Sequence, residues 1–247
     1  MIKHLLMSVC VFLCASLASA EPLFLNDDGS PIASRTVCGK NDMENMIDLD
    51  EQLNSMGTPI GNLRGGGLSC TGVMISNDVF LTARHCNVGC ANTKVTFGYL
   101  SRAKETFACK ETLAIGNSNN NQDYMALRLE GSPGVNWGYY DISDKPVAAG
   151  TDLLMIHHPG GTPMKVSRKN CKFMGESNGL ISHSCDTNPG SSGSAVLIPD
   201  YDKPENSRVV AVHVLGGCNS SSTNYNKGPS IRHIVTLSPL LKSMVKN

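Results

Sequence analysis

The apolar residues of this chain come in many short runs, and this pattern restricts the possible folds more than any other feature. Turn-forming residues interrupt the sequence between the runs, and the chain contains 24 glycines and 12 prolines. Short apolar runs bounded by glycine, proline or asparagine favour strands over helices. Examples are residues 72–75, 79–82, 95–97, 124–129, 153–156, 195–198 and 209–215. So many short strands predict an all-β protein, either a sandwich or a barrel.

One short helix is expected at the C-terminus, over about residues 238–246. Ser238 can cap its first turn, and Pro239 suits the first helical position. The apolar residues after them recur at helical spacing and would form a stripe for packing, made of Leu240, Leu241, Met244 and Val245.

The N-terminus has the pattern of a secretory signal peptide. Lys3 supplies a positive charge, an apolar run covers residues 5–17, and the small residues 18–20 offer a cleavage site. The alternative is a membrane anchor, for which the run is short. We therefore expect residues 1–20 to be removed and the mature protein to be secreted, to the extracellular or periplasmic space, without a membrane attachment. Residues 21–35 are mostly polar or turn-forming and are expected to be a propeptide or tail.

Eight cysteines remain after the expected signal peptide, and they agree with export. An even number of cysteines in an exported chain indicates disulfides, whereas a zinc site is disfavoured because no Cys-x-x-Cys pair occurs. Cys70 and Cys86 lie 16 residues apart, and a bridge between them would fix the segment that presents His85. Closing a loop of this size contributes about 3 kcal/mol to stability in the chain-entropy picture.

Three residues stand in contexts that suit nucleophilic catalysis. Ser192 lies in a Gly-Ser-Ser-Gly-Ser segment, where a tight turn could aim the backbone N–H groups of Gly190 and Ser192 at a developing oxyanion. His85 follows an apolar strand and precedes a cysteine. Asp123 stands between a polar loop and the strand expected at 124–129, so it could orient an imidazole and stabilise its cation.

Each of these three signals also has a structural explanation. Glycine-serine turns are common without a function, a single histidine is more often structural, and an aspartate here can simply end the loop as an Asx turn. Asp141 and Asp144 are alternatives to Asp123, but neither precedes a comparable strand. The combination is more specific than its parts, because the chain order His85, Asp123, Ser192 is one of the known orders of a catalytic triad.

That order, together with the local sequences, resembles the chymotrypsin-like serine protease superfamily. Leu-Thr-Ala-Arg-His-Cys at 81–86 is similar to the Leu-Thr-Ala-Ala-His-Cys motif of the superfamily. Residues 123–129 are similar to its aspartate-strand motif, and 190–194 to its Gly-x-Ser-Gly-Gly/Ser motif. The resemblance covers about residues 37–245, and it implies that the catalytic residues lie in a cleft between two barrels.

The resemblance implies a trypsin-like serine protease domain over residues 36–247, with two six-stranded antiparallel β-barrels. The N-terminal barrel would cover about 36–135 and the C-terminal barrel about 136–235. The implied activity is peptide-bond hydrolysis through an acyl-enzyme on Ser192, with protein or peptide substrates, a monomeric enzyme and no cofactor or metal. The 21 basic and 21 acidic residues give zero formal net charge, which argues against a nucleic-acid or membrane-surface binder.

Within the superfamily the chain is similar to secreted bacterial glutamyl endopeptidases and their trypsin-like relatives. Asp186 and Thr187 before the serine turn, the segment 157–161, and His213 ahead of two glycines carry this similarity. It implies that Thr187 and His213 line the substrate pocket and donate to an acidic side chain. Asp186, however, has the spacing from the serine at which trypsin binds arginine and lysine. The preference before the scissile bond therefore stays open between acidic, basic and broad.

Two residues depart from the superfamily pattern. Arg84 replaces a small residue beside the histidine, and Ser191 stands where trypsin has an aspartate, so the ion pair that trypsin forms with a new N-terminus cannot form. A zymogen is still expected, with maturation near Arg35–Thr36, because the resemblance begins just after these residues.

The remaining cysteines fit no single template of the superfamily. We expect a second disulfide between Cys171 and Cys185. The four cysteines that remain can pair in three ways, and the pairing Cys38–Cys218 with Cys90–Cys109 is one hypothesis among them.

Two other classes of function are alternatives to the protease. A catalytically inactive binding or toxin-like module with the protease fold is the main one, although an intact triad argues against it. A disulfide-rich structural protein would leave the spacings of the three motifs unexplained. His157 and His158 could bind a metal, but a turn before Pro159 is the plainer interpretation.

Overall fold

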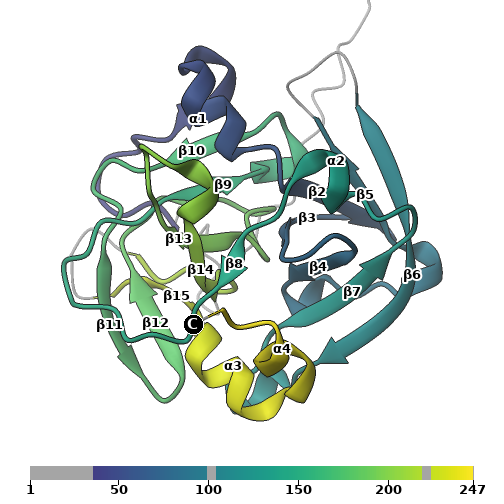
Figure 1. Ribbon diagram of the computed structural model, residues 1–247. Coiled ribbons are helices and arrows are strands. Elements are labelled where there is room, and N and C mark those ends of the chain that lie inside the picture. The colour runs from purple at the N-terminus through teal and green to yellow at the C-terminus, as the bar shows by residue number, and fades with distance from the viewer. Residues whose placement is uncertain (1–35, 99–103, 219–223, 247) are drawn as a thin grey trace, which may run out of the picture. The chain divides into compact units, whose positions relative to one another are not determined.

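The structure is a computed structural model, and it describes residues 36–98, 104–218 and 224–246 (Figure 1). The expected signal peptide and the expected propeptide lie outside the described residues. Within those residues the protein is mostly β with few helices, as the short apolar runs predicted. No helix in the described part of the chain is long and apolar enough to cross a membrane.

Six antiparallel strands in the first half of the chain close into a barrel, in the order β2-β3-β4-β7-β6-β5. Their side chains alternate between the two faces of the barrel wall: large apolar ones such as Leu63, Phe80 and Phe97 fill the interior, and others such as Val73 and Leu81 are buried on the outer face. The predicted N-terminal barrel is therefore present, although its strands begin only at residue 60. These strands are β2 (Ile60–Gly65), β3 (Leu68–Met74), β4 (Val79–Thr82), β5 (Lys94–Phe97), β6 (Glu105–Ile115) and β7 (Met125–Leu129).

The second half of the chain forms three small sheets, and a second six-stranded barrel is not confirmed. The strands have only two to five residues, so single bridges such as Leu154–Leu197 and Ala211–Ser230 connect the sheets. One pairing, between β8 and β14, is parallel rather than antiparallel. The first sheet contains β1 (Glu44–Asn45), β10 (Lys165–Ser167) and β9 (Met155–His157); the second contains β11 (Phe173–Ser177), β12 (Leu180–His183) and β15 (Asn226–Pro229); the third contains β13 (Ala195–Ile198), β14 (Arg208–Val212) and β8 (Asp141–Ile142).

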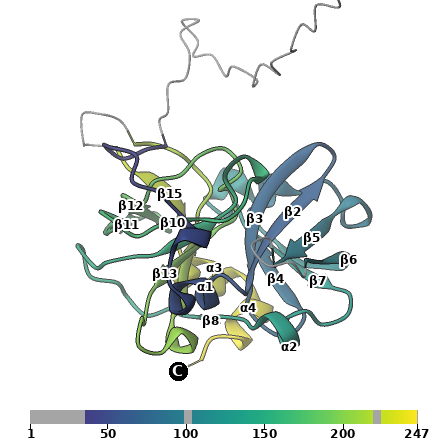
Figure 2. The same ribbon diagram turned by 90° about the horizontal axis from the view of Figure 1, so that it is seen from above.

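The N-terminal segment joins the second half of the chain instead of the first barrel. Its strand β1 pairs with β10, and the disulfide Cys38–Cys218 ties it to a loop 180 residues further along. The N-terminal barrel was expected to cover about residues 36–135; its first strand in the structure begins at Ile60, and the earlier strand β1 pairs with β10. The barrel and the three sheets lie side by side in both views (Figures 1 and 2).

The C-terminus contains two short helices, where one was expected over 238–246. The helix α3 (Ile231–Leu237) ends just before Ser238, and α4 (Pro239–Ser243) begins just after it. Ser238 accepts a hydrogen bond from the Leu241 N–H and caps α4, as predicted. Two more short helices are α1 (Glu51–Met56) and α2 (Gly134–Trp137).

All eight cysteines of the described part form disulfides. The pairs are Cys38–Cys218, Cys70–Cys86, Cys90–Cys109 and Cys171–Cys185, which are the pairs named from the sequence. Two of them brace the barrel and one braces the second half, while Cys38–Cys218 closes a much longer loop. Longer loops lose more entropy when they are closed, so this last bridge restricts the unfolded chain most.

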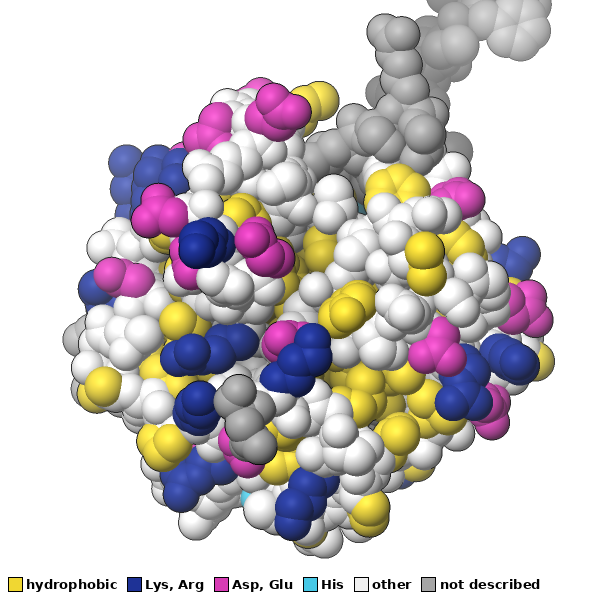
Figure 3. Space-filling view, in the orientation of Figure 1, with side chains coloured by type: hydrophobic (Ala, Val, Ile, Leu, Met, Phe, Trp, Pro, Cys, Tyr) yellow, Lys and Arg dark blue, Asp and Glu magenta, His cyan; other side chains and the backbone are white. Residues whose placement is uncertain are grey.

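Basic and acidic side chains are interspersed on the face shown in Figure 3. Among the described residues, charged side chains form ion pairs, for example Lys246 with Asp141 at 2.8 Å and Arg128 with Asp78 at 3.0 Å. This mixture agrees with the zero formal net charge of the sequence.

Candidate active site

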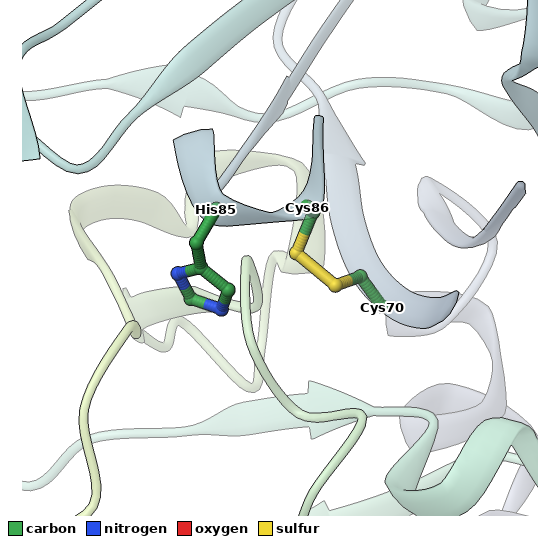
Figure 4. A group of neighbouring side chains, drawn as sticks. All are labelled: Cys70, His85 and Cys86. Atoms are coloured by element: carbon green, nitrogen blue, oxygen red, sulfur yellow. A yellow bond between two sulfur atoms is a disulfide. The ribbon is translucent and has the colours of Figure 1, made fainter. Parts of the chain in front are cut away.

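The candidate histidine lies at the end of β4, on a short 3-10 helix over Arg84–Cys86. Cys86 is fully buried and bonded to Cys70 on β3, so the helix is fixed to the barrel wall. Figure 4 shows the imidazole of His85 beside this disulfide. The two sulfur atoms and the imidazole lie within 4.8 Å of one another, but sulfurs bonded to each other offer no thiolate to a metal.

Asp123 reaches His85 from the loop before β7. Its Oδ2 lies 2.7 Å from Nδ1 of His85, and its Oδ1 accepts the backbone N–H of His85 at 3.0 Å. Burial raises the pKa of Asp123, but the hydrogen bonds and the charge of His85 outweigh burial and hold this pKa below its ordinary value. Asp123 is therefore an ionised carboxylate that keeps a proton on Nδ1 and leaves Nε2 free to accept one.

The two alternative aspartates take no part in this arrangement. Asp141 pairs with Lys246, and no contact joins Asp144 to His85 among the described residues. The side chain of Asp123 is 17% exposed and that of His85 is 40% exposed, so the imidazole faces solvent while its carboxylate partner is shielded.

The turn that carries Ser192 is fastened to the first barrel through Thr71 of β3. The Thr71 N–H donates to the carbonyl oxygen of Ser192, and its hydroxyl donates to the carbonyl oxygen of Gly190, both at 2.9 Å. Gly193 packs so closely against Thr82 and Ala83 that a Cβ atom would collide with both. Since Ala83 is two residues before His85, the serine turn and the histidine lie next to each other.

No hydrogen bond joins Oγ of Ser192 to the His85 ring within the described residues. Catalytic hydrogen bonds are often long in a free enzyme and shorten when the substrate binds. Ser192 is half-buried, so its hydroxyl is open to the solvent from which a substrate arrives.

Two backbone donors of the serine turn are available for an oxyanion. The N–H groups of Ser191, Gly193 and Ser194 donate to the carbonyl oxygens of Asn188, His213 and Ser191 respectively. Those of Gly190 and Ser192 have no acceptor in the described part of the chain. Gly190 has φ +94°, a value that favours glycine, so this turn depends on it.

The expected pocket residues have different surroundings. Oδ1 and Oδ2 of Asp186 accept the backbone N–H groups of Cys38 and Asp42, at 2.7 and 2.9 Å. Burial raises the pKa of Asp186, although these two hydrogen bonds act against the rise. The carboxylate is thus bound to the N-terminal segment, a partner that its spacing from Ser192 did not reveal.

Thr187 and Asn226 both hold the carbonyl oxygen of Thr36. The N–H and hydroxyl of Thr187 donate to this oxygen at 3.0 and 3.2 Å, and Nδ2 of Asn226 donates to it at 2.8 Å. Nδ2 of Asn226 also lies 3.2 Å from the Thr187 hydroxyl, and its Oδ1 accepts the N–H of Gly217 at 2.9 Å. Sequence reasoning did not name Asn226, and a buried asparagine with these distant partners gives no local signal.

His213 is buried against a second histidine. Its Nδ1 lies 3.1 Å from Nε2 of His183, and its backbone carbonyl accepts the N–H of Gly193. Burial, followed by the charge of His85, lowers the pKa of His213 to about 3, so its ring is neutral. The sequence did not indicate a role for His183, because His183 and His213 come into contact only when the sheets pack.

The comparison with protein families gives a match over most of the chain. Residues 33–230 match the model for the lysyl endopeptidase, C-terminal domain. No curated protein sequence matches the chain.

Solved structures share the fold at low sequence identity. A Glu endopeptidase in complex with MPD has a TM-score of 0.62 and 22% identity, over 78% of this chain and 93% of that chain. The Rv3671c protease in its inactive form has a TM-score of 0.59 and 15% identity, over 85% of this chain and 98% of that chain. The inactive serine-to-alanine mutant of Rv3671c from M. tuberculosis H37Rv has a TM-score of 0.60 and 14% identity, over 85% and 100%.

These structural likenesses show a chymotrypsin-like serine protease fold, as the three sequence motifs indicated. The family match supports a serine endopeptidase in general, and it covers all of the elements that carry His85, Asp123 and Ser192. The chain belongs to the lysyl endopeptidase C-terminal domain family.

Proposed function

We propose that this protein is a secreted serine endopeptidase that hydrolyses peptide bonds through an acyl-enzyme on Ser192. The observation that carries the proposal is the 2.7 Å hydrogen bond between His85 and the ionised Asp123, next to a turn with two backbone donors that have no acceptor among the described residues. A module that only binds protein would have no use for this combination.

The residues suggest the following course of reaction. Oγ of Ser192 attacks the scissile carbonyl carbon while Nε2 of His85 takes the hydroxyl proton. The N–H groups of Gly190 and Ser192 stabilise the oxyanion, and Asp123 stabilises the imidazolium. His85 then gives its proton to the leaving amine, and water hydrolyses the acyl-enzyme by the same two proton transfers.

Labelling by a peptidyl organophosphonate tests this function. The probe forms a bond from phosphorus to Oγ of an activated serine and loses its leaving group. We expect one label per molecule, located on Ser192 by peptide mapping, and none on the Ser192→Ala variant. A matched variant, Ser194→Ala, removes a hydroxyl of the same turn and should still be labelled. Failure of the native protein to react would favour the inactive binding module.

For the substrate preference we propose acidic residues before the scissile bond. The family is named for lysyl endopeptidase. A lysine preference in this chain would need a free carboxylate, and both oxygens of Asp186 already accept hydrogen bonds from the N-terminal segment. His213 offers a donor instead, whereas the N–H and hydroxyl of Thr187 already donate to the carbonyl oxygen of Thr36. His213 is a donor on Nε2 in the tautomer where His183 Nε2–H donates to His213 Nδ1.

Cleavage of a peptide library decides between these preferences. We expect cuts after glutamate or aspartate, and a loss of this preference in His213→Ala. The Asp186→Asn variant should keep the preference, because its side chain contacts Cys38 and Asp42 rather than substrate. Cuts after lysine or arginine that disappear in Asp186→Asn would overturn the acidic preference.

We also propose that the protein is exported, that it matures by cleavage near Arg35–Thr36, and that it acts as a monomer. Four disulfides suit an oxidising compartment, which supports secretion. A cut near Arg35–Thr36 would leave a new ammonium group at Thr36, whose carbonyl oxygen contacts Thr187 and Asn226. A positive charge there would attract an acidic side chain, so the cut should raise activity.

A further inference from the structure

A buried histidine that the proposed reaction does not use contacts the serine turn. His157, the last residue of β9, is 0% exposed. Its Nδ1 lies 2.6 Å from the hydroxyl of Ser191, the residue directly before the catalytic serine. On the other side of the ring, Nε2 lies 3.3 Å from the hydroxyl of Ser167. The ring therefore bridges β10 and the turn that supplies the oxyanion donors.

The protons of this network have one consistent assignment. The Ser167 hydroxyl donates its only proton to the carbonyl oxygen of Asp186 at 2.7 Å, so towards His157 it must accept. His157 thus carries its proton on Nε2, and its Nδ1 is an acceptor. The Ser191 hydroxyl accepts the N–H of Asn188 at 3.1 Å and donates to Nδ1 of His157. Each donor and acceptor in this network has a hydrogen-bond partner only while the His157 ring is neutral. The ring is neutral at ordinary pH, because burial lowers the pKa of His157 to about 3.

The turn that follows His157 fixes the orientation of one oxyanion donor. The N–H of Gly160 donates to the carbonyl oxygen of Pro189 at 2.6 Å. In a trans peptide the C=O and the next N–H point in opposite directions, so this bond directs the N–H of Gly190 away from Gly160. The two turns touch backbone to backbone, because a Cβ atom on Gly190 would lie 2.6 Å from N of Gly160 and 2.9 Å from O of His158.

We propose that residues 157–161 hold the turn 188–193 in its active conformation, with His157 as a positioning residue for the oxyanion hole. This proposal rests on the proposed protease function and adds a residue to it. In trypsin a carboxylate at the place of Ser191 fixes the turn through an ion pair, and this chain has no carboxylate there. A neutral hydrogen bond from Ser191 to His157 and the bond from Gly160 to Pro189 take over that role.

Two variants of similar size separate positioning from mere packing. Asparagine in His157→Asn offers an acceptor for the Ser191 hydroxyl, whereas leucine in His157→Leu does not. Ser191→Ala removes the other partner of the same bond and changes only one hydroxyl. Tyr140→Phe is the matched control, because it also removes one buried hydroxyl, bonded to the carbonyl of Met56 at 2.7 Å and remote from the turn.

The measurements are kcat and KM on a peptide substrate, the affinity for a peptide aldehyde, and the melting temperature. Ser192 adds to the aldehyde carbon, and the aldehyde oxygen then occupies the oxyanion position, so its affinity reports on the donors directly. We expect His157→Leu and Ser191→Ala to lower kcat and aldehyde affinity by the same factor, about 10- to 100-fold, with little change in KM. His157→Asn should recover most of this loss.

These measurements distinguish a failure of the positioning role of His157 from a failure of the proposed protease function. Tyr140→Phe should lower the melting temperature and leave kcat and aldehyde affinity unchanged. If folded Ser191→Ala and His157→Leu also keep native kcat and aldehyde affinity, the positioning role is wrong although the protease function stands. If His157→Leu does not fold, native kcat and aldehyde affinity in Ser191→Ala alone are enough to overturn the positioning role. If the native protein neither cleaves peptides nor reacts with an organophosphonate, both proposals fall.

Discussion

Acidification should destabilise this protein strongly, because several histidines are buried without a negative partner. His157, His183 and His213 are almost completely inaccessible to solvent. Burial is the main cause that lowers their pKa values, to about 3 for His157 and His213 and well below the ordinary value for His183. All three are therefore neutral in the folded protein across most of the acidic range.

The size of the effect follows from the difference between the folded and unfolded states. An unfolded histidine binds a proton as the pH falls below about 6.5, whereas these three do not while the protein is folded. Between about pH 6.5 and 3 the unfolded state thus binds more protons, and the free energy of unfolding decreases as the pH decreases. At pH 5 His157 and His213 each cost about 2 kcal/mol relative to pH 8, so the two together cost about 4 kcal/mol, and His183 adds to the loss in the same direction.

A loss of this size is comparable with the whole stability of a typical domain, about 5–15 kcal/mol. Asp186 acts in the opposite direction, because burial raises its pKa and its folded form takes up a proton more readily. It is a single group, so the histidines dominate between pH 8 and 5. Asp123 and Glu44 have lowered pKa values, and the stability they contribute is lost only at still lower pH.

Urea unfolding at several pH values measures this loss. The Ser192→Ala variant should be used, so that self-cleavage does not interfere, and the free energy of unfolding compared between pH 8 and pH 5. His157→Gln serves as the second variant: whatever its stability at pH 8, its loss on acidification should be smaller by about 2 kcal/mol, because the pKa of His157 is lowered to about 3. A total loss below about 2 kcal/mol, or an equal loss in both proteins, would refute the reasoning.

Three further outcomes are expected. Ser192→Ala and His85→Ala should each lower turnover by several orders of magnitude with the fold intact by circular dichroism, and undiminished cleavage by either purified variant would contradict the mechanism. Replacing Cys70 and Cys86 together by alanine should lower the free energy of urea unfolding by about 3 kcal/mol, and free thiols at both positions in the native protein would exclude the bridge. N-terminal sequencing of the active enzyme should find Thr36 first, and full activity with residues 21–35 attached would exclude a required cut.

Structural features that depend only on residues close together in the sequence could be predicted without the structure. The first barrel follows from runs such as 79–82 and 124–129, because alternation and turn residues are local properties of a strand. The Cys70–Cys86 bridge links β3 to the short 3-10 helix that follows the neighbouring strand β4, so its short spacing was informative. The N–H groups of Gly190 and Ser192 also belong to one tight turn, and the glycines that favour this turn are visible in the sequence.

Other features depend on residues that are far apart in the chain, and only the tertiary structure decided them. The spacing of Asp186 suggested a receptor for basic substrates, yet its partners are the backbone of Cys38 and Asp42, 148 and 144 residues away. The bond from His157 to Ser191 spans 34 residues and two separate elements. The partners of such a side chain depend on its position in the packed structure. Neither strand propensity nor the spacing of residues in the sequence predicts that position.

In the second half of the chain, the pairing of the strands also depends on residues that are far apart in the sequence. Some of its strands were predicted from apolar runs, such as 195–198 and 209–215, but the way the strands assemble, with β8 parallel to β14 and the N-terminal β1 added to β10, was not. Strands of two to five residues make few ladder hydrogen bonds each, so their pairing is set by the core they cover and by the Cys38–Cys218 bridge. Register in so short a strand is a property of its surroundings, and those surroundings exist only in the folded molecule.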